Sequence, residues 1–489
     1  MIRKLFKDIS QYFPAKIIPS IVTIITLPIL TRLFSPSHYG NYVLVVGIVT
    51  ILMLLGGWVS LAISRFYPVY EKKGETKEFS GLIIRLAFLT ILIIAFLSLV
   101  FLFFFRGRIP LNLYPLMIIG VPVYMVTSFF VILLNFLRIK RQIKRYSRFF
   151  IWMRLTTPVF GVLLVVIFHL GLKGMLFGAI LSIALTLPFL WKAAVGEMRI
   201  TESIISFKPA VEMIKYSFPL VLGSLAAWIL SLSDRYILGI FRNTQEVGIY
   251  SISYIIAQNS ILFITSLFAM AFNPLSVIIW ERQGEEMSKE FVAKSTRYFL
   301  ILCVPAAVGV SVLREPLLQM LSTPNYFAGA KVIPLVVLGV FFFGLTQRFG
   351  AGLSLYKKTN FYMYSFILAS LLNLGLNFLF IPKYGYMAAA ITTLISYAFL
   401  LLLTVVFSRQ FFIWEFSFKS LAKISCAAAI MGIGIYFTGC MLTLSALPGL
   451  ILMVPLGITI YLLMLFLLRE IRPDEIQALQ ALKQYVLKR

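Results

Sequence analysis

The chain contains few charged residues, and acidic residues are the scarcer sign. Charged residues make up only 13% of the 489 residues, with 18 Asp and Glu against 44 Lys and Arg. Hydrophobic residues make up 60%, more apolar surface than a soluble protein of this length could bury. The shortage of charge therefore excludes an ordinary soluble domain and indicates a protein that lies largely within a membrane.

Cysteine is also scarce, with Cys303, Cys426 and Cys440 as the three copies. All three lie in apolar runs and lack the spacing of metal ligands, so we predict small buried hydrophobic residues and no metal site. The first apolar run is full length and lacks a small-residue cleavage site. It is therefore predicted to be a retained helix rather than a signal peptide.

Fourteen apolar runs are long enough to cross a bilayer, which takes roughly 20 residues each. A backbone in lipid must satisfy its own hydrogen bonds, and the runs are longer than barrel strands. We therefore expect an all-α polytopic membrane protein with about 14 transmembrane helices.

The basic residues lie mostly in alternate gaps between these runs. With the N-terminus inside, the inner segments hold 32 of them, the outer segments 9 and the runs themselves 3. This asymmetry follows the positive-inside rule and predicts a multi-pass protein of the cytoplasmic (inner) membrane with both termini in the cytoplasm. The net charge of +26 then needs no nucleic-acid partner.

A weak internal repeat links the first and seventh runs. Tyr12-Phe13-Pro14 matches Tyr216-Ser217-Phe218-Pro219, and Tyr39-Gly40-Asn41-Tyr42 matches Val247-Gly248-Ile249-Tyr250. The offset is 204 to 208 residues. Six crossings per unit would give two parallel repeats, an arrangement that places a binding site between them.

The repeat predicts three parts of the chain. Residues 1–200 form an N-terminal six-helix lobe, and residues 201–410 form a C-terminal six-helix lobe. Residues 411–489 add two transmembrane helices and a cytoplasmic amphipathic tail, whose helix is expected over 469–489.

Three cations lie inside the predicted crossings: Arg348, Lys16 and Arg154. Intramembrane charges are costly and usually face a cavity or a partner. Arg348 stands out because it lies about 14 Å along a helix from Lys357 and Lys358, too far for easy snorkelling to the interface. Lys16 and Arg154 lie within about two turns of the inner surface, so either snorkelling or a cavity role fits.

Three more cations lie at helix ends: Arg32, Arg65 and Arg85. Each would serve as a plain anchor for its helix, but a ring of such residues would also attract an anionic headgroup. Five uncharged polar residues could line the same cavity or form interhelical hydrogen bonds. They are Gln347, Tyr254, Gln258, Asn373 and Asn377.

Asp234 is the clearest acidic residue near membrane depth. It fits a counter-charge, an ion-coupling site or a plain helix-end residue. Its neighbour Arg235 need not pair with it, because adjacent helical residues point about 100° apart.

Four short motifs resemble those of a known family. They are Leu30-Thr31-Arg32-Leu33-Phe34-Ser35-Pro36, Tyr39-Gly40-Asn41-Tyr42, Asp234-Arg235-Tyr236-Ile237-Leu238-Gly239 and Val247-Gly248-Ile249-Tyr250. With the length and the six-plus-six repeat, they make the chain similar to the polysaccharide repeat-unit (O-antigen type, Wzx-like) flippases. These belong to the multidrug/oligosaccharidyl-lipid/polysaccharide exporter superfamily.

The resemblance implies a transporter rather than an enzyme. It would move undecaprenyl-diphosphate-linked oligosaccharide repeat units from the inner to the outer leaflet by alternating access, for polysaccharide biosynthesis. It implies no cofactor, but coupling to H⁺ or Na⁺, as in an antiporter. The implied partners are the polyprenyl-diphosphate-linked oligosaccharide, membrane lipids, and a polymerase with its chain-length machinery. The intramembrane arginines fit independently, because a diphosphate in low dielectric needs fixed positive charge.

Three alternatives carry less support. A lipid II flippase would show a Ser-Arg pair followed by Gly and Arg-Glu in its first crossing, and this pattern is absent. A multidrug cation exporter would use a mid-membrane acid, which the first six predicted crossings lack. A membrane glycosyltransferase or polymerase usually has a large outer loop or an acidic metal site, and the sequence has neither.

Overall fold

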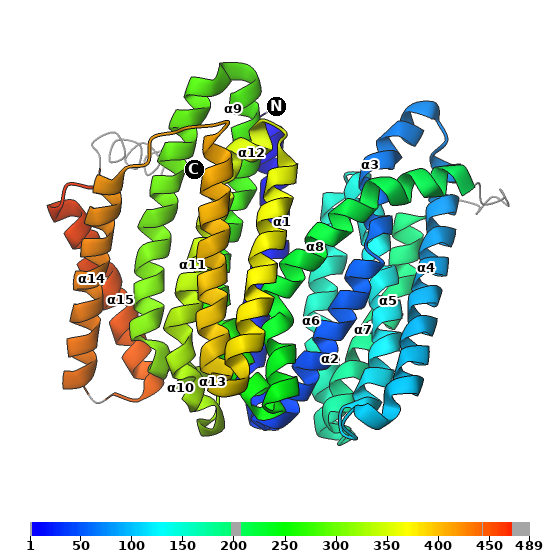
Figure 1. Cartoon of the computed structure of the whole chain (residues 1–489), viewed down its shortest axis with the longest axis horizontal. Helices are drawn as coiled ribbons and strands as arrows, with labels where there is room; N and C mark the ends of the chain where they lie inside the picture. The colour runs from blue at the N-terminus through cyan, green and yellow to red at the C-terminus, as the bar shows by residue number, and fades with distance from the viewer. Residues whose placement is uncertain (1, 197–206, 443, 472–489) are drawn as a thin grey trace, which may run out of the picture. The chain divides into compact units, whose positions relative to one another are not determined.

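The computed structural model describes residues 2–196, 207–442 and 444–471, and these residues form helices without any β-strand. Most of the predicted tail helix, from residue 472 onward, lies outside the described residues. Figure 1 labels most of the helices. In chain order they are α1 (Ile2–Leu33), α2 (Pro36–Leu55), α3 (Trp58–Lys73), α4 (Thr76–Phe105), η1 (Arg106–Arg108), α5 (Tyr114–Ile139), α6 (Ile143–Ile167), α7 (Gly171–Ala194), α8 (Phe207–Phe241), α9 (Thr244–Val312), α10 (Arg314–Leu321), η2 (Pro324–Val332), α11 (Ile333–Phe349), α12 (Ala351–Leu355), α13 (Thr359–Arg409), α14 (Phe418–Met441) and α15 (Ala446–Leu467).

The length and apolar character of these helices confirm a multi-pass membrane protein. Eleven helical segments are long and apolar enough to cross a bilayer, and α1 adds a shorter apolar segment over Ile17–Leu33. Two of the eleven, α9 with 69 residues and α13 with 51, are each long enough for two crossings. Counted in this way, the described helices supply the fourteen predicted crossings, and the predicted all-α polytopic fold is confirmed.

The two longest helices reverse direction at single glycines. Gly284 in α9 has φ 81° and ψ −168°, and Gly385 in α13 has φ 59° and ψ −144°. Residues with a Cβ rarely combine a positive φ with so negative a ψ, so glycine is required for both turns. Figure 1 shows α9 turning back at the top of the view and α13 at the bottom. Each helix is therefore two membrane crossings joined by a tight turn.

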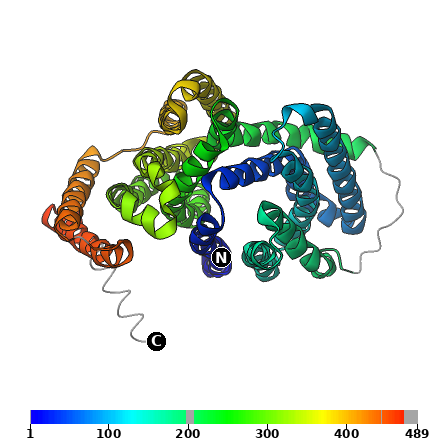
Figure 2. The same ribbon diagram turned by 90° about the horizontal axis from the view of Figure 1, so that it is seen from below.

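Contacts divide the chain into two compact units. Unit 1 contains Met1–Ser251 and Phe366–Ala389, and unit 2 contains Ile252–Ser365 and Ala390–Arg489. In unit 1, α5 packs against both α4 and α7, as Figures 1 and 2 show. In unit 2, α14 and α15 form an antiparallel pair. The lobes drawn from the repeat, 1–200 and 201–410, stay a prediction.

A buried ion cluster fastens the end of α15 to the rest of unit 2. The Arg297 guanidinium of α9 donates from Nε to Glu470 Oε1 at 2.7 Å, and its Nη2 donates to the Glu470 carbonyl oxygen. Lys423 of α14 lies 3.8 Å from Glu470 Oε2 and donates to the Arg469 carbonyl oxygen at 3.1 Å. The side chains of Arg297 and Glu470 are 6% and 5% exposed, so the pair depends on its own contacts rather than on water.

We expect Glu470→Ala to destabilise the protein strongly, because it leaves the Arg297 guanidinium buried without its carboxylate. Removing one partner of a buried ion pair costs about 3–5 kcal/mol, whereas replacing both partners with apolar residues is often neutral or stabilising. The melting temperature of the detergent-solubilised protein should therefore fall by several degrees in Glu470→Ala. It should recover in the double variant Arg297→Met/Glu470→Met.

A matched control lies on the same helix. Lys294 and Glu290 form an exposed pair at 2.6 Å, each about half exposed, so Lys294→Ala should change stability by less than about 1 kcal/mol. Equal falls in melting temperature for Lys294→Ala and Glu470→Ala would contradict a structural role for the buried cluster.

Candidate functional site

The two copies of the repeated glycine motif lie against each other in unit 1. A Cβ on Gly40 of α2 would lie 1.9 Å from the Thr244 carbonyl oxygen, and one on Gly248 of α9 would lie 2.0 Å from the Pro36 carbonyl oxygen. Thr244 follows Pro36 by the same 208 residues that separate the two glycines. The first turns of α2 and α9 thus cross reciprocally, about a local two-fold relation, at a distance that only glycine permits.

Polar contacts reinforce this crossing, which we call the outer crossing because the distribution of basic residues predicts that this end faces away from the cytoplasm. The Ser37 and Thr244 hydroxyl oxygens are 2.8 Å apart, and the Tyr236 hydroxyl of α8 donates to the Leu44 carbonyl oxygen at 2.8 Å. The Asn243 side chain caps α9 by accepting from the Glu246 amide at 2.8 Å. The motifs that carried the family resemblance therefore hold α2, α8 and α9 together at one end of unit 1.

Asp234 is buried beside this crossing and its carboxylate is paired. The Tyr250 hydroxyl donates to Asp234 Oδ2 at 2.6 Å, and Arg235 Nη1 donates to Oδ1 at 3.0 Å. Arg235 also donates to the Ser231 carbonyl oxygen at 2.8 Å. The pairing was not expected from helical geometry alone. It arises because the long Arg235 side chain folds back along its own helix.

The two predicted asparagines of α13 form a buried network in unit 1. Asn377 donates to the Asn373 side-chain oxygen at 2.9 Å, and the Ser233 hydroxyl donates to the same oxygen at 3.2 Å. Asn373 is 1% exposed and Asn377 is fully buried. The bond from Ser233 joins α8 to α13 through Asn373, whereas the bond between Asn377 and Asn373 lies within α13.

Arg348 is the most unusual charged residue of unit 2. It is fully buried in the last turn of α11, and none of its three guanidinium nitrogens has a hydrogen-bond partner within the described residues. Three phenylalanines of α9 surround it instead. The guanidinium carbon lies 4.2 Å from the ring centroid of Phe272, 5.7 Å from that of Phe299 and 5.9 Å from that of Phe268.

The aromatic cage and the helix dipole offset the cost of burying this charge, but they supply no hydrogen-bond acceptor to the guanidinium. Each desolvated cation–π contact contributes about 2 kcal/mol, and the negative end of the α11 dipole adds up to about 2 kcal/mol. A buried ion without an ionic partner costs several kcal/mol even after relaxation. Arg348 therefore remains a cation whose hydrogen-bonding capacity is unused, as a site for an anion requires.

The other predicted polar residues of unit 2 are less isolated. The hydroxyl oxygens of Tyr254 and Tyr397 are 3.3 Å apart, and Tyr254 is buried. Gln258 and Gln347 are half-buried, and Gln347 directly precedes Arg348.

The remaining predicted cations of unit 1 that the structure describes have separate local contacts. Arg32 is exposed and donates to the Pro28 carbonyl oxygen at 3.3 Å. Arg65 and Arg154 are exposed beside aromatic rings of Tyr216 and Phe150, at 5.7 Å and 5.3 Å from the ring centroids. Arg85 is half-buried, and the Lys16 side chain lies outside the described part of the chain.

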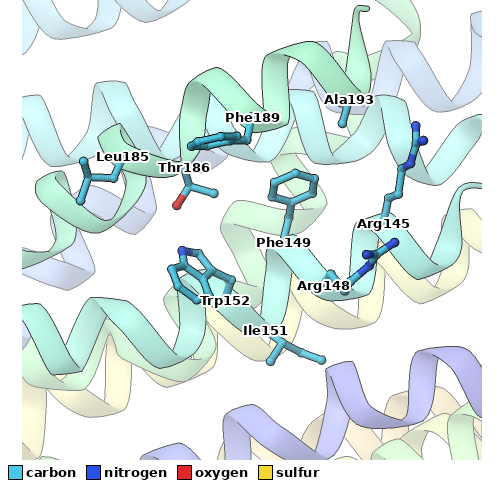
Figure 3. A pocket seen from close by; sticks show the side chains of 9 residues that line it. All are labelled: Arg145, Arg148, Phe149, Ile151, Trp152, Leu185, Thr186, Phe189 and Ala193. Carbon is cyan, nitrogen blue, oxygen red and sulfur yellow. The ribbon is translucent and has the colours of Figure 1, made fainter.

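One basic feature was missed because its arginines belong to an inner segment. Arg145 and Arg148 of α6 line a groove of about 750 Å³ between α6 and α7, together with large apolar side chains (Figure 3). From the sequence, both arginines were predicted only to set the orientation of the protein in the membrane. The usable signal was their spacing, since Phe149 and Trp152 continue the same face of the helix.

Comparisons with known proteins agree with this architecture. A family model described as "Polysaccharide biosynthesis protein" matches residues 5–280, more than half of the chain. The chain belongs to the polysaccharide biosynthesis protein family. A second family model, MatE, matches residues 219–379. The family resemblance drawn from the motifs is therefore confirmed.

Two curated relatives are distant. A probable low-salt glycan biosynthesis flippase of Haloferax volcanii is 22% identical over 268 residues, covering 55% of this chain and 56% of the relative. An uncharacterized membrane protein of Methanocaldococcus jannaschii is 24% identical over 194 residues, covering 40% and 38%. The chain thus spans about half the length of the first of these relatives and less of the second.

Solved structures share the fold. The lipid II flippase MurJ in an inward closed conformation aligns with a TM-score of 0.75 at 19% identity, over 95% of this chain and 99% of that one. An inward-facing multidrug resistance MATE family transporter of the MOP superfamily aligns with a TM-score of 0.61 at 13% identity, over 83% and 93%. At such identities the likeness establishes the fold alone.

The outer crossing generates a direct prediction. A methyl group at Gly40 or Gly248 would collide with a backbone carbonyl, so Gly40→Ala and Gly248→Ala should each push α2 and α9 apart. Ser37→Cys, in a background with Cys426 and Cys440 replaced by Ser, should then react several times faster with a membrane-impermeant maleimide.

The control is Gly81→Ala in α4, where an added Cβ meets nothing within 4 Å. This variant should leave the labelling rate of Ser37→Cys unchanged. Unchanged labelling in Gly40→Ala and Gly248→Ala as well would show that the close approach does not limit access to this end of unit 1.

Proposed function

We propose that this protein is a flippase that moves polyprenyl-diphosphate-linked oligosaccharide repeat units from the inner to the outer leaflet for polysaccharide biosynthesis. Family membership supports a role in polysaccharide biosynthesis, and the named curated relative is itself a probable glycan flippase. The observation that carries the proposal is Arg348, a buried guanidinium without a hydrogen-bond partner among the described residues.

The headgroup of such a substrate carries the anionic hydrogen-bond acceptors that the Arg348 guanidinium lacks in this structure. A diphosphate offers several charged oxygens, and a guanidinium can bind two of them side by side. In the proposed cycle the Arg348 side chain leaves the rings of Phe268, Phe272 and Phe299 and binds the diphosphate. The aromatic cage would stabilise the cation between cycles, so binding need not recover the whole desolvation cost.

The uncharged polar side chains of the predicted site would bind the sugar. Gln347 and Gln258 carry amide groups that are not fully buried, and hydroxyl-rich ligands are bound through such donors and acceptors. We propose that Tyr254, Asn373 and Asn377 become available to the sugar when the helices that bury them move apart.

The outer crossing supports alternating access. A direct backbone contact between α2 and α9 would close the outer end in the present conformation, and its separation would open it. We propose that Asp234, held by Tyr250 and Arg235, is a counter-charge at this end. Coupling of the cycle to H⁺ or Na⁺, as in an antiporter, is proposed without an assigned ion.

The basic residues favour residence in the cytoplasmic membrane with both termini inside. A polymerase and its chain-length machinery are the proposed consumers of the flipped repeat unit.

A lipid II flippase is the second candidate, since a structure of that class has the same fold. Proteoliposomes loaded with either lipid separate the two, because the proposal requires translocation of the polyprenyl-diphosphate oligosaccharide and little of lipid II.

Arg348→Met tests the site by separating stability from transport. Replacing an unpaired buried cation with an apolar side chain of similar length should keep or raise the melting temperature, because the desolvation cost disappears. Loss of a charged hydrogen bond to the substrate should lower translocation in proteoliposomes at least tenfold.

Arg409→Met is the matched control, since Arg409 is exposed at the end of α13. It should leave both readouts near those of the unmodified protein. Normal translocation by Arg348→Met at equal protein content would remove Arg348 from the substrate site. A large fall in its melting temperature would indicate a structural role instead.

A further inference from the structure

The groove between α6 and α7 is basic at one end and apolar along the rest, and it has no role in the transport cycle proposed above. We call it the α6–α7 groove and define it by Arg145, Arg148, Phe149 and Trp152 of α6 with Leu185 and Phe189 of α7. Its volume of about 750 Å³ is in the range of ligand sites. Figure 3 shows the two arginines at one end and the apolar side chains between the two helices.

The charged end is entirely basic. Arg145 and Arg148 lie in the first two turns of α6 and are both exposed, and no acidic residue is among the described residues that line the groove. Arg145 donates to the Gln142 side-chain oxygen at 3.1 Å, which positions its guanidinium at the helix start. The distribution of basic residues predicts that this end lies at the inner membrane surface.

The rest of the groove is apolar and open. Trp152 and Leu185 are each 54% exposed and Phe189 is 70% exposed. From Arg145 to Trp152 the face runs seven residues, or roughly 10 Å, from the basic end into the predicted crossing. A bound molecule must therefore combine an anionic head with an apolar chain that follows the helices into the hydrocarbon.

We propose that the α6–α7 groove binds one anionic phospholipid of the inner leaflet. Its phosphate would lie between the Arg145 and Arg148 guanidinium groups, and an acyl chain would lie along Phe149, Trp152, Leu185 and Phe189. Basic pockets between helices at the cytoplasmic surface bind anionic headgroups in this way. Charge complementarity disfavours a neutral lipid, and the apolar extension disfavours a soluble anion.

The test uses Trp152 as a reporter in the full-length protein. The chain has six tryptophans, so fluorescence in nanodiscs is compared with that of Trp152→Phe to isolate one of them. Phosphatidylglycerol brominated on its acyl chains should quench Trp152 at a lower lipid fraction than brominated phosphatidylcholine. In Arg145→Gln/Arg148→Gln, the fraction of phosphatidylglycerol needed for half-quenching should rise about tenfold or more.

The matched control is Arg141→Gln/Lys144→Gln, which removes the same charge from exposed neighbours that do not line the groove. It should retain the preference for phosphatidylglycerol. An equal loss of this preference in the control would indicate diffuse attraction to the basic surface rather than a site. Equal quenching by the two lipids would show that the groove does not select an anionic headgroup. Displacement of brominated phosphatidylglycerol by a polyprenyl diphosphate at equal mole fraction would also overturn the proposal, because it would assign the groove to the transported lipid.

Gel filtration and melting temperature decide whether each variant is folded before quenching is compared. If Arg145→Gln/Arg148→Gln is unstable, the single variants Arg145→Lys and Arg148→Lys provide the test. They keep the charge and lose the fork of donors, so half-quenching should shift less than in the single variants Arg145→Gln and Arg148→Gln, which are measured beside them. A larger shift in a lysine variant than in the glutamine variant of the same residue would contradict recognition through charge.

Discussion

The hydrocarbon core of a bilayer offers no hydrogen bonds, and the structure of this protein depends on that constraint. Backbone groups are satisfied within helices, and the turns at Gly284 and Gly385 each join two helices at a single residue. Polar side chains at depth find partners on their own or a neighbouring helix, as Asn373 does with Asn377 of α13 and with Ser233 of α8. A group without such a partner is an exception that the fold must stabilise by other means.

The buried charges divide by this criterion. Glu470 is held by Arg297 and Lys423, and Asp234 by Arg235 and Tyr250, so both carboxylates are neutralised by contacts of ordinary length. Arg348 is faced by aromatic rings and has no hydrogen-bond partner among the described residues. An ionic partner would stabilise it further but would also occupy the donors that the proposed anionic substrate needs. The aromatic cage therefore stabilises the Arg348 cation less than an ionic partner would, but it leaves the hydrogen-bond donors of the guanidinium free to bind an anion.

Close approach of helices is the second means by which this membrane protein holds together. Without a hydrophobic driving force between helices in lipid, association depends on packing and on polar contacts at short range. At the outer crossing, Gly40 and Gly248 permit carbonyl contact, while Ser37 and Thr244 add a hydroxyl pair. A contact built from glycine and two hydroxyls buries little apolar surface, which suits the gate that we propose at this end of unit 1.

The sequence alone determined the helical class, the count of crossings and the family, because these follow from the length of apolar runs and from local motifs. It also singled out Arg348, since a charge inside an apolar run is costly wherever the helix packs. The tertiary structure decided which polar groups are paired. Helical geometry did not predict the pairing of Asp234 with Arg235, because it depends on how a long side chain folds. The repeat did not predict that Gly40 would contact Thr244. The spacing of Arg145 and Arg148 did not predict a groove, because its other wall is formed by α7. The ion pair, the glycine contact and the groove depend on side-chain conformation or on contacts between residues far apart in the chain. Local periodicity in the sequence encodes neither of these.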